Sequence, residues 1–64
     1  MSVIKPSCKL VGENGNVFNL MSIVVKTLEK AGQYDQAKEV KLKLPQCKSY
    51  DDALVMFQEY VDVY

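Results

Sequence analysis

Histidine and arginine are both absent from this chain of 64 residues, and each absence narrows the range of functions. Histidine is the side chain that most often moves protons at neutral pH, so we expect no general acid–base enzyme. Arginine is the usual ligand of bases and phosphates in nucleic-acid binders, which also carry a basic patch. Here eight lysines are balanced by eight acidic residues, and nucleic acid is therefore a disfavoured partner.

Cysteine and long apolar runs are scarce as well. Cys8 and Cys47 have no further ligands at suitable spacing, whereas a structural zinc site normally needs four, so we expect no metal and no cofactor. Two reduced thiols are the favoured state of this pair, with a disulfide left open. No apolar run approaches the roughly 20 residues of a spanning helix, and the first residues lack a hydrophobic signal region. We therefore expect no membrane segment and a cytoplasmic location.

The apolar content of 48% is that of a globular protein, so residues 1–64 are expected to form a single small domain. Residues 1–7 are predicted to be a loose lead-in, because Pro6 biases Lys5 away from helical geometry. A chain of this length buries only about 60% of its unfolded surface. Apolar surface left outside so small a core favours association, and a homodimer is therefore one expectation.

The strongest local signal is the pair Asn14-Gly15, which stands between apolar residues. Both residue types accept the positive φ that a type I′ turn requires twice. The sequence therefore predicts a β-hairpin with strands at about 8–13 and 16–18; a single turn without paired strands is the alternative. Asn19 is predicted to cap the following helix, because its side-chain oxygen can accept from a free N–H of the first turn.

Apolar residues at a spacing of three and four predict three helices, at about 20–31, 34–43 and 50–62. Their predicted buried stripes contain, in chain order, Leu20, Val24, Leu28 and Ala31; Tyr34, Ala37, Val40 and Leu44; and Tyr50, Ala53, Leu54, Phe57, Tyr60, Val61 and Tyr64. Val55 and Met56 lie off the last stripe and are candidates for covering the hairpin or meeting another subunit. The predicted fold class is therefore α+β and mostly α: a short N-terminal hairpin packed on three helices.

Helix boundaries are indicated by single residues. Gly32 is expected to end the first helix and Pro45 the second. Ser49 is expected to open the third in a capping box whose acidic member is Asp52. The third helix is also acidic, because residues 49–64 carry a net charge of −4 and residues 1–48 a net charge of +4. This pattern bears on orientation and choice of partner more than on stability.

Four patterns in the sequence bear on chemistry. The stretch Asn16 to Asn19 leads into a helix N-terminus, where exposed N–H groups can hold an anion. A helix-turn-helix can be drawn across Gly32, with Lys38 and Lys41 on the second helix, against the zero net charge. Asp51 and Asp52 are adjacent and point in different directions on a helix, so capping is their expected role. No serine has a histidine to activate it, and nucleophilic catalysis has no support.

Residues 10–18 read Leu-Val-Gly-Glu-Asn-Gly-Asn-Val-Phe, and residues 28–32 read Leu-Glu-Lys-Ala-Gly. Two closing segments are Ser49-Tyr-Asp-Asp-Ala-Leu and Glu59-Tyr-Val-Asp-Val. Together they resemble a family of small, mostly uncharacterised proteins encoded by bacteriophages and bacterial mobile elements, with the motif Leu-x-Gly-x-(Asp/Asn)-Gly-Asn-x-Phe and an amphipathic C-terminal helix. Pro45-Gln-Cys is not part of the pattern. The resemblance implies a bacterial host cytoplasm and no assigned activity.

The leading hypothesis is a non-catalytic phage or mobile-element accessory protein that acts by binding a protein. The alternatives are a DNA-binding helix-turn-helix-like module and a small anion- or nucleotide-binding protein. The candidate interaction residues are Asn14, Asn16, Asn19, Lys38, Lys41, Val55 and Met56. No catalytic, cofactor-binding or metal-binding residue is predicted.

Overall fold

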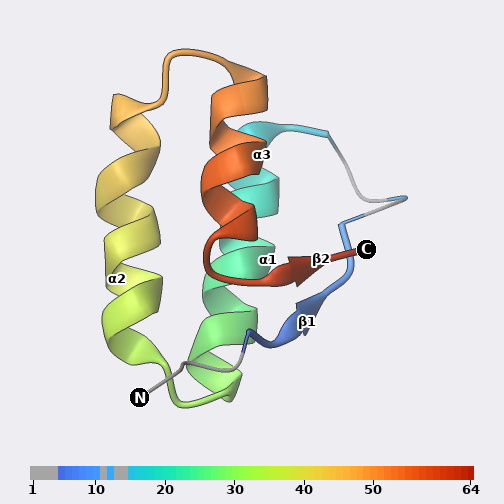
Figure 1. Cartoon of the computed structure of the whole chain (residues 1–64), viewed down its shortest axis with the longest axis vertical. Helices are drawn as coiled ribbons and strands as arrows, with labels where there is room; N and C mark the ends of the chain where they lie inside the picture. The colour runs from blue at the N-terminus through green and yellow to red at the C-terminus, as the bar shows by residue number, and fades with distance from the viewer. Residues whose placement is uncertain (1–4, 11, 13–14) are drawn as a thin grey trace.

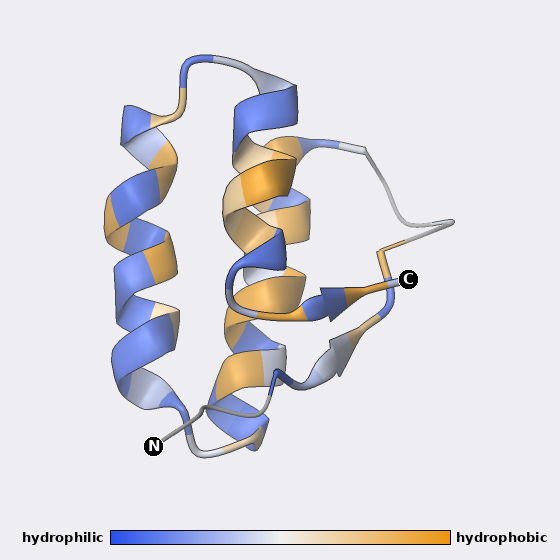
Figure 2. Ribbon diagram, in the orientation of Figure 1, coloured by the Kyte–Doolittle hydropathy of each residue, from blue (hydrophilic) through white to orange (hydrophobic). Residues whose placement is uncertain are grey.

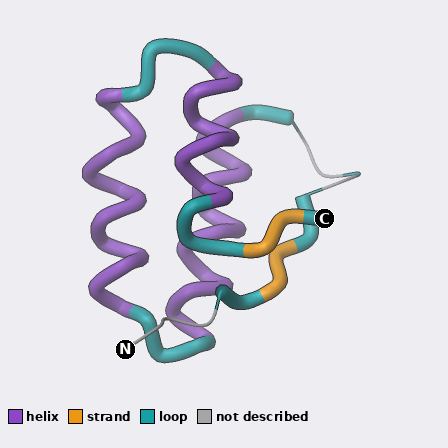
Figure 3. Tube along the Cα trace, viewed as in Figure 1, coloured by secondary structure: helices purple, strands orange, loops and turns teal. Residues whose placement is uncertain are grey.

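The computed structural model describes residues 5–10, 12 and 15–64. In these residues the backbone forms three α-helices, one 3-10 turn and two short strands (Figures 1 and 3). In chain order they are β1 (Ser7–Cys8), α1 (Val17–Lys30), α2 (Tyr34–Lys43), η1 (Leu44–Gln46), α3 (Tyr50–Gln58) and β2 (Asp62–Val63). The predicted α+β class with a majority of helix is confirmed.

The three helices pack side by side and alternate in direction along the chain. In Figure 1, α1 and α3 run downward, and α2, which lies between them in the sequence, runs upward. Gly32 adopts a φ of 77°, which an L side chain rarely tolerates, and its N–H donates to Glu29 O at 3.0 Å. The N–H of Gln33 then donates to Leu28 O at 2.8 Å, which satisfies carbonyls that the helix end would leave free. The predicted stop at Gly32 is therefore confirmed.

The start of α1 corrects the sequence prediction. Asn16, not Asn19, is the N-cap: its Oδ1 accepts from the N–H of Phe18 at 2.8 Å. Capping at Asn16 adds a turn of helical hydrogen bonds, beginning with Leu20 N–H to Asn16 O at 3.0 Å. The predicted second hairpin strand at 16–18 is therefore wrong. Asn14, the first residue of the predicted turn, lies outside the described residues.

The strand pairing joins the two ends of the described chain. β1 and β2 pair in parallel, with Ser7 opposite Asp62 and Cys8 opposite Val63. The pairing continues beyond the strands, since the Tyr64 N–H donates to Cys8 O at 3.0 Å and the Leu10 N–H donates to Tyr64 O at 2.7 Å. A parallel pair needs a long crossover, and here the whole helical bundle supplies it.

Two predicted boundaries change as a result. The third helix ends at Gln58 rather than at 62, because residues 62–63 are taken up by β2. The predicted loose lead-in also ends earlier, because Pro6 O accepts from the Asp62 N–H at 2.9 Å and Ser7 already belongs to β1.

One apolar cluster lies between the helices and the strand pair, where the hydrophobic sides of the ribbons face inward (Figure 2). Its buried members are Cys8, Leu10, Leu20, Val24, Val25, Leu28, Ala37, Val40, Leu44, Ala53, Met56, Phe57, Tyr60 and Val61. Met56 is only 6% exposed, so its predicted place off the buried stripe is wrong. Ala31, Tyr34, Tyr50 and Tyr64 are exposed, which corrects their predicted burial.

Candidate functional site

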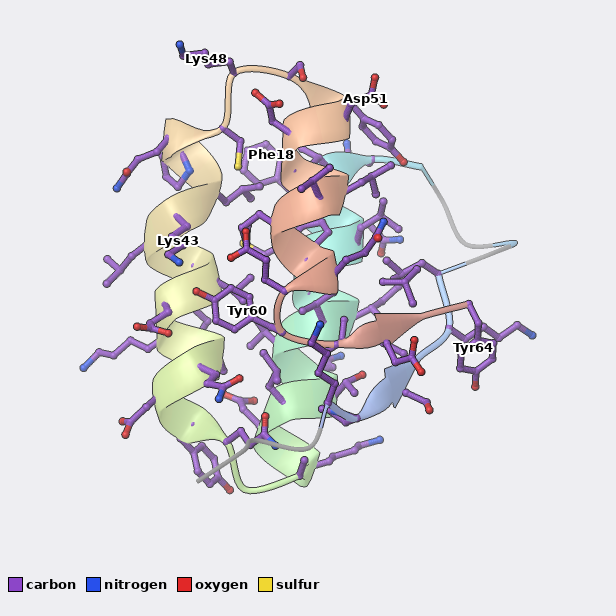
Figure 4. The ribbon with its side chains drawn as sticks, in the orientation of Figure 1. Phe18, Lys43, Lys48, Asp51, Tyr60 and Tyr64 are labelled. Carbon is purple, nitrogen blue, oxygen red and sulfur yellow. The ribbon has the colours of Figure 1, made fainter. Side chains whose placement is uncertain are left out.

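An apolar groove opens at one end of the bundle, between the starts of α1 and α3 and the turn η1. We call it the end groove; it is lined by Val17, Phe18, Leu44, Pro45, Cys47, Lys48, Ser49, Tyr50 and Ala53, and it holds about 350 Å³. That volume is near the lower limit of ligand-binding clefts, which run from about 300 to 1,000 Å³. Figure 4 shows Phe18, Lys48 and Asp51 at this end of the molecule.

Two aromatic side chains dominate the wall of the end groove. Phe18 is 65% exposed and Tyr50 is 46% exposed, although both are large enough to serve as core residues. Phe18 comes two residues before the buried Leu20 and so lies about 200° around α1 from it. Leaving a side chain of this size in water forgoes about 1.5 to 3 kcal/mol of burial energy. A partner that covered these rings would recover part of that energy.

Helix caps fix the backbone on both sides of the groove. At α3, Ser49 Oγ accepts from the Asp52 N–H at 3.2 Å, and Asp52 Oδ2 accepts from the Lys48 N–H at 3.3 Å. The predicted capping pair is confirmed, with the reciprocal bond made to Lys48 instead of Ser49. A Cβ placed on Gly15 would lie 3.7 Å from the Tyr50 hydroxyl, so this ring leans toward the segment that leads into α1. The groove is therefore largely formed before any partner arrives.

The same caps weigh against anion binding at this end. The N–H of Phe18 is bonded to Asn16 and that of Asp52 to Ser49, so these helix-start donors already have partners. Asp51 and Asp52 also place negative charge in the first turn of α3, where an anion would otherwise be attracted. The wall of the end groove is therefore mostly apolar.

Cys47 gives the groove a thiol, whereas Cys8 lies in the core. Both cysteines are free, so the favoured prediction of two thiols agrees with the structure. Cys47 is half-buried, and its Sγ lies 3.5 Å from Lys43 O. Cys8 is buried, and the Thr27 hydroxyl lies 3.5 Å from its Sγ. In the described ranges, no group of three potential metal ligands is found.

A contact between Lys43 and Tyr60 joins α2 to the segment after α3. Lys43 Nζ lies 5.1 Å from the centre of the Tyr60 ring, and Figure 4 shows the two side chains next to each other. The hydrogen bond from Lys43 to Tyr60 raises the pKa of Lys43 above its usual value of 10.5, and the charges of Glu59 and Glu39 act in the same direction. This contact covers the outer face of Tyr60 and is structural.

The structure does not bring the predicted interaction residues together. Asn16 caps α1 beside the end groove, and Asn19 is half-buried in the first turns of the same helix. Lys38 and Lys41 are exposed on α2. Asn14 lies outside the described residues.

The last two candidate interaction residues, Val55 and Met56, are adjacent in the sequence but differ in exposure. Val55 is 61% exposed on the outer side of α3, where a partner could reach it. Met56 faces the core and is corrected to a packing residue.

Sequence reasoning missed the residues that form the end groove. Phe18 was assigned to a strand face and Tyr50 to a buried helix stripe, and Pro45 was considered only as a helix stop. A usable signal exists at both aromatic residues, because each comes one or two positions after a capping residue. An aromatic residue in a first helical turn lies at the end of the bundle, where packing from the neighbouring helices stops.

Comparison with protein-family models, curated proteins and solved structures gave no significant match. None of the described helices has the length and apolar content to cross a bilayer. The fold and the groove define the chain as a small three-helix α+β protein with an aromatic-walled apolar groove at one end of its bundle.

Proposed function

We propose that this chain is a non-catalytic protein-interaction module whose end groove receives an apolar side chain from a partner protein. The observation that carries the proposal is the exposed pair Phe18 and Tyr50 on the rim of a preformed apolar groove. Exposed aromatic residues around a pocket are typical of the energetic centre of protein interfaces. The volume of about 350 Å³ suits a short segment rather than a large cofactor.

The cellular setting of the proposal rests on the resemblance to bacteriophage and mobile-element proteins. Under this proposal the chain is an accessory protein in a bacterial host cytoplasm, as the resemblance implies. The absence of histidine from the whole sequence supports a non-catalytic role, and so does the use of Ser49 as a helix cap.

The DNA-binding alternative receives less support from the fold. A DNA-binding helix-turn-helix crosses its two helices at about 90 to 120°. Figure 1 shows α1 and α2 lying side by side in opposite directions across Gly32. Such a helical hairpin does not present its second helix as a separate rod for the major groove.

Selection from a random peptide library on the immobilised full chain tests the proposal. We expect peptides with large apolar side chains to be enriched by the wild-type protein and by the control V55A, whose altered residue is exposed outside the groove. Enrichment should be lost on the double variant F18A/Y50S. Both of its sites are exposed, so the fold should persist.

Cys47 provides a second readout within the same protein. It lines the groove and is half-buried, whereas Cys8 is buried in the core. A selected peptide that occupies the groove should slow the alkylation of Cys47 by a thiol reagent. Equal enrichment on F18A/Y50S, or unchanged alkylation of Cys47 with the peptide bound, would overturn the proposal.

A further inference from the structure

The outer side of α3 forms an acidic face. It consists of Asp51, Asp52, Val55 and Glu59, all of which are exposed. Val55 is two residues from both Ala53 and Phe57, which are buried, and therefore points about 200° away from the core. The three carboxylates surround this one apolar side chain, and residues 49–64 contain no lysine.

A basic face lies on α1 and α2. Lys26 is two residues from both Val24 and Leu28, which are buried, so it points away from the core. Lys26 and Lys30 line a shallow hollow of about 330 Å³ together with Glu29 and Tyr34, so two cations and one carboxylate surround it.

The α2 helix extends the basic face. Lys38 and Lys41 follow Tyr34 by four and seven residues and therefore share its side of the helix. Tyr34 is 65% exposed, so most of its ring is open to solvent. Lys43 lies on the opposite side of α2, against Tyr60, and does not belong to the basic face.

We propose that a second copy of this chain docks with its acidic face on the basic face of the first. The charges are complementary, and each face has an exposed apolar side chain among its charges: Val55 on one and Tyr34 on the other. A symmetric dimer through either face would oppose like charges, so the contact joins two different surfaces. Because the two faces lie on different helices, each docked copy leaves one acidic and one basic face open, and larger oligomers follow.

The end groove takes no part in this contact, so the inference is independent of the proposed function. The contact depends on exposed charges, which salt screens over about 8 Å at physiological ionic strength. We expect weak self-association whose association constant falls about tenfold or more between low and high salt.

Sedimentation equilibrium of the full chain at low and high salt is the first test. The wild-type protein should form oligomers at low salt that dissociate at high salt. The acidic-face variant D51N/V55S/E59Q and the basic-face variant K26Q/Y34S/K38Q should each be monomeric. The controls D62N and K9Q change exposed residues outside the two faces and should associate like the wild type.

Mixing the two monomeric variants is the decisive test. Each retains one intact face, so an equimolar mixture should form heterodimers and nothing larger. Circular dichroism of each variant checks that loss of association is not loss of folding. The variant F18A/Y50S, with an altered end groove, should still associate.

Three results would overturn the inference: a wild-type monomer at high micromolar concentration and low salt, oligomers that persist in both face variants, or a mixture that stays monomeric. Loss of self-association in F18A/Y50S would move the contact to the end groove and also refute the inference. Peptide binding to the groove is measured separately, so failure of either proposal leaves the other standing.

Discussion

The backbone N–H of Asp62 donates to the carbonyl oxygen of Pro6 at 2.9 Å, and this bond joins segments 56 residues apart in the sequence. It starts the parallel register of β1 and β2, which closes the helical bundle on one side. Such a contact carries a high entropic cost of loop closure, because its two ends are far apart in the chain.

The substitution D62P tests how much the pairing of β1 with β2 contributes to the free energy of unfolding. Proline removes the donor and restricts the backbone, so we expect a loss of about 3 kcal/mol in the free energy of unfolding. D62N keeps the N–H and should change stability by less than about 0.5 kcal/mol. Urea denaturation of both variants measures the difference, and equal stability would show that the strand pair adds little.

Substitutions at the adjacent residues Val55 and Met56 compare an exposed side chain with one in the core. M56A should cost about 2 to 5 kcal/mol, because it empties a buried site, while V55A removes an exposed side chain and should cost about 0.5 kcal/mol or less. A protein of this size has a total stability on the order of 3 to 10 kcal/mol, so M56A should remove a large share of it. Urea midpoints of the two variants compare them directly, and the reverse order would contradict the assigned orientation of α3.

Most of the bundle was predictable because the signals were local. Gly32 and Ser49 were correctly placed at helix boundaries, and the stripe of Val24 and Leu28 was correctly placed in the core. These features depend on residues within a few positions of one another, and a sequence displays such spacing directly.

The strand pairing could not be predicted in the same way. The helix was predicted to reach residue 62 because Val61 and Tyr64 continue the apolar spacing of α3, and nothing near Cys8 indicates a partner at the other end of the chain. The start of α1 was missed because Asn16 and Asn19 are equally good capping residues. The choice between them depends on which helix length packs best, which is a property of the whole fold.

The end groove was missed for a related reason. Helical spacing shows which side of a helix faces the core, but it does not show where the neighbouring helices stop. Tyr50 satisfies the spacing of the buried stripe of α3, yet it is exposed because it lies beyond the end of the packed region.

The cap at the start of α1 yields a third prediction. N16A removes the acceptor of the Phe18 N–H and should lower the free energy of unfolding by about 1 kcal/mol. N16D retains an acceptor and places a negative charge at the helix N-terminus, so it should match or exceed the wild-type stability. Thermal unfolding followed by circular dichroism distinguishes the two, and a neutral N16A would show that the cap is not formed in solution.

The two thiols yield a fourth prediction. Cys47 is half-buried at the end groove and should react with an alkylating reagent in the native protein. Cys8 is buried beneath Thr27 and should react only when the fold opens, which occurs in a fraction of about 10⁻³ to 10⁻⁶ of the molecules. Mass spectrometry of the labelled peptides over time gives both rates. Comparable rates for the two thiols would mean that Cys8 is not buried in the native protein in solution.

The contact between Lys43 and Tyr60 determines how stability depends on alkaline pH. The pKa of Lys43 is raised in the folded state, so the charged form is favoured by folding. The resulting stabilisation is complete below the unfolded pKa of 10.5 and is lost as the pH rises through the higher folded value. K43M should therefore remove part of the fall in stability above pH 10.5, while Y60F retains the ring and removes only the hydroxyl. Urea midpoints of the wild type and both variants from neutral to alkaline pH measure this effect. Identical pH profiles for the wild type and K43M would contradict the contact, whereas a profile altered in K43M but not in Y60F would assign it to the ring rather than to the hydroxyl.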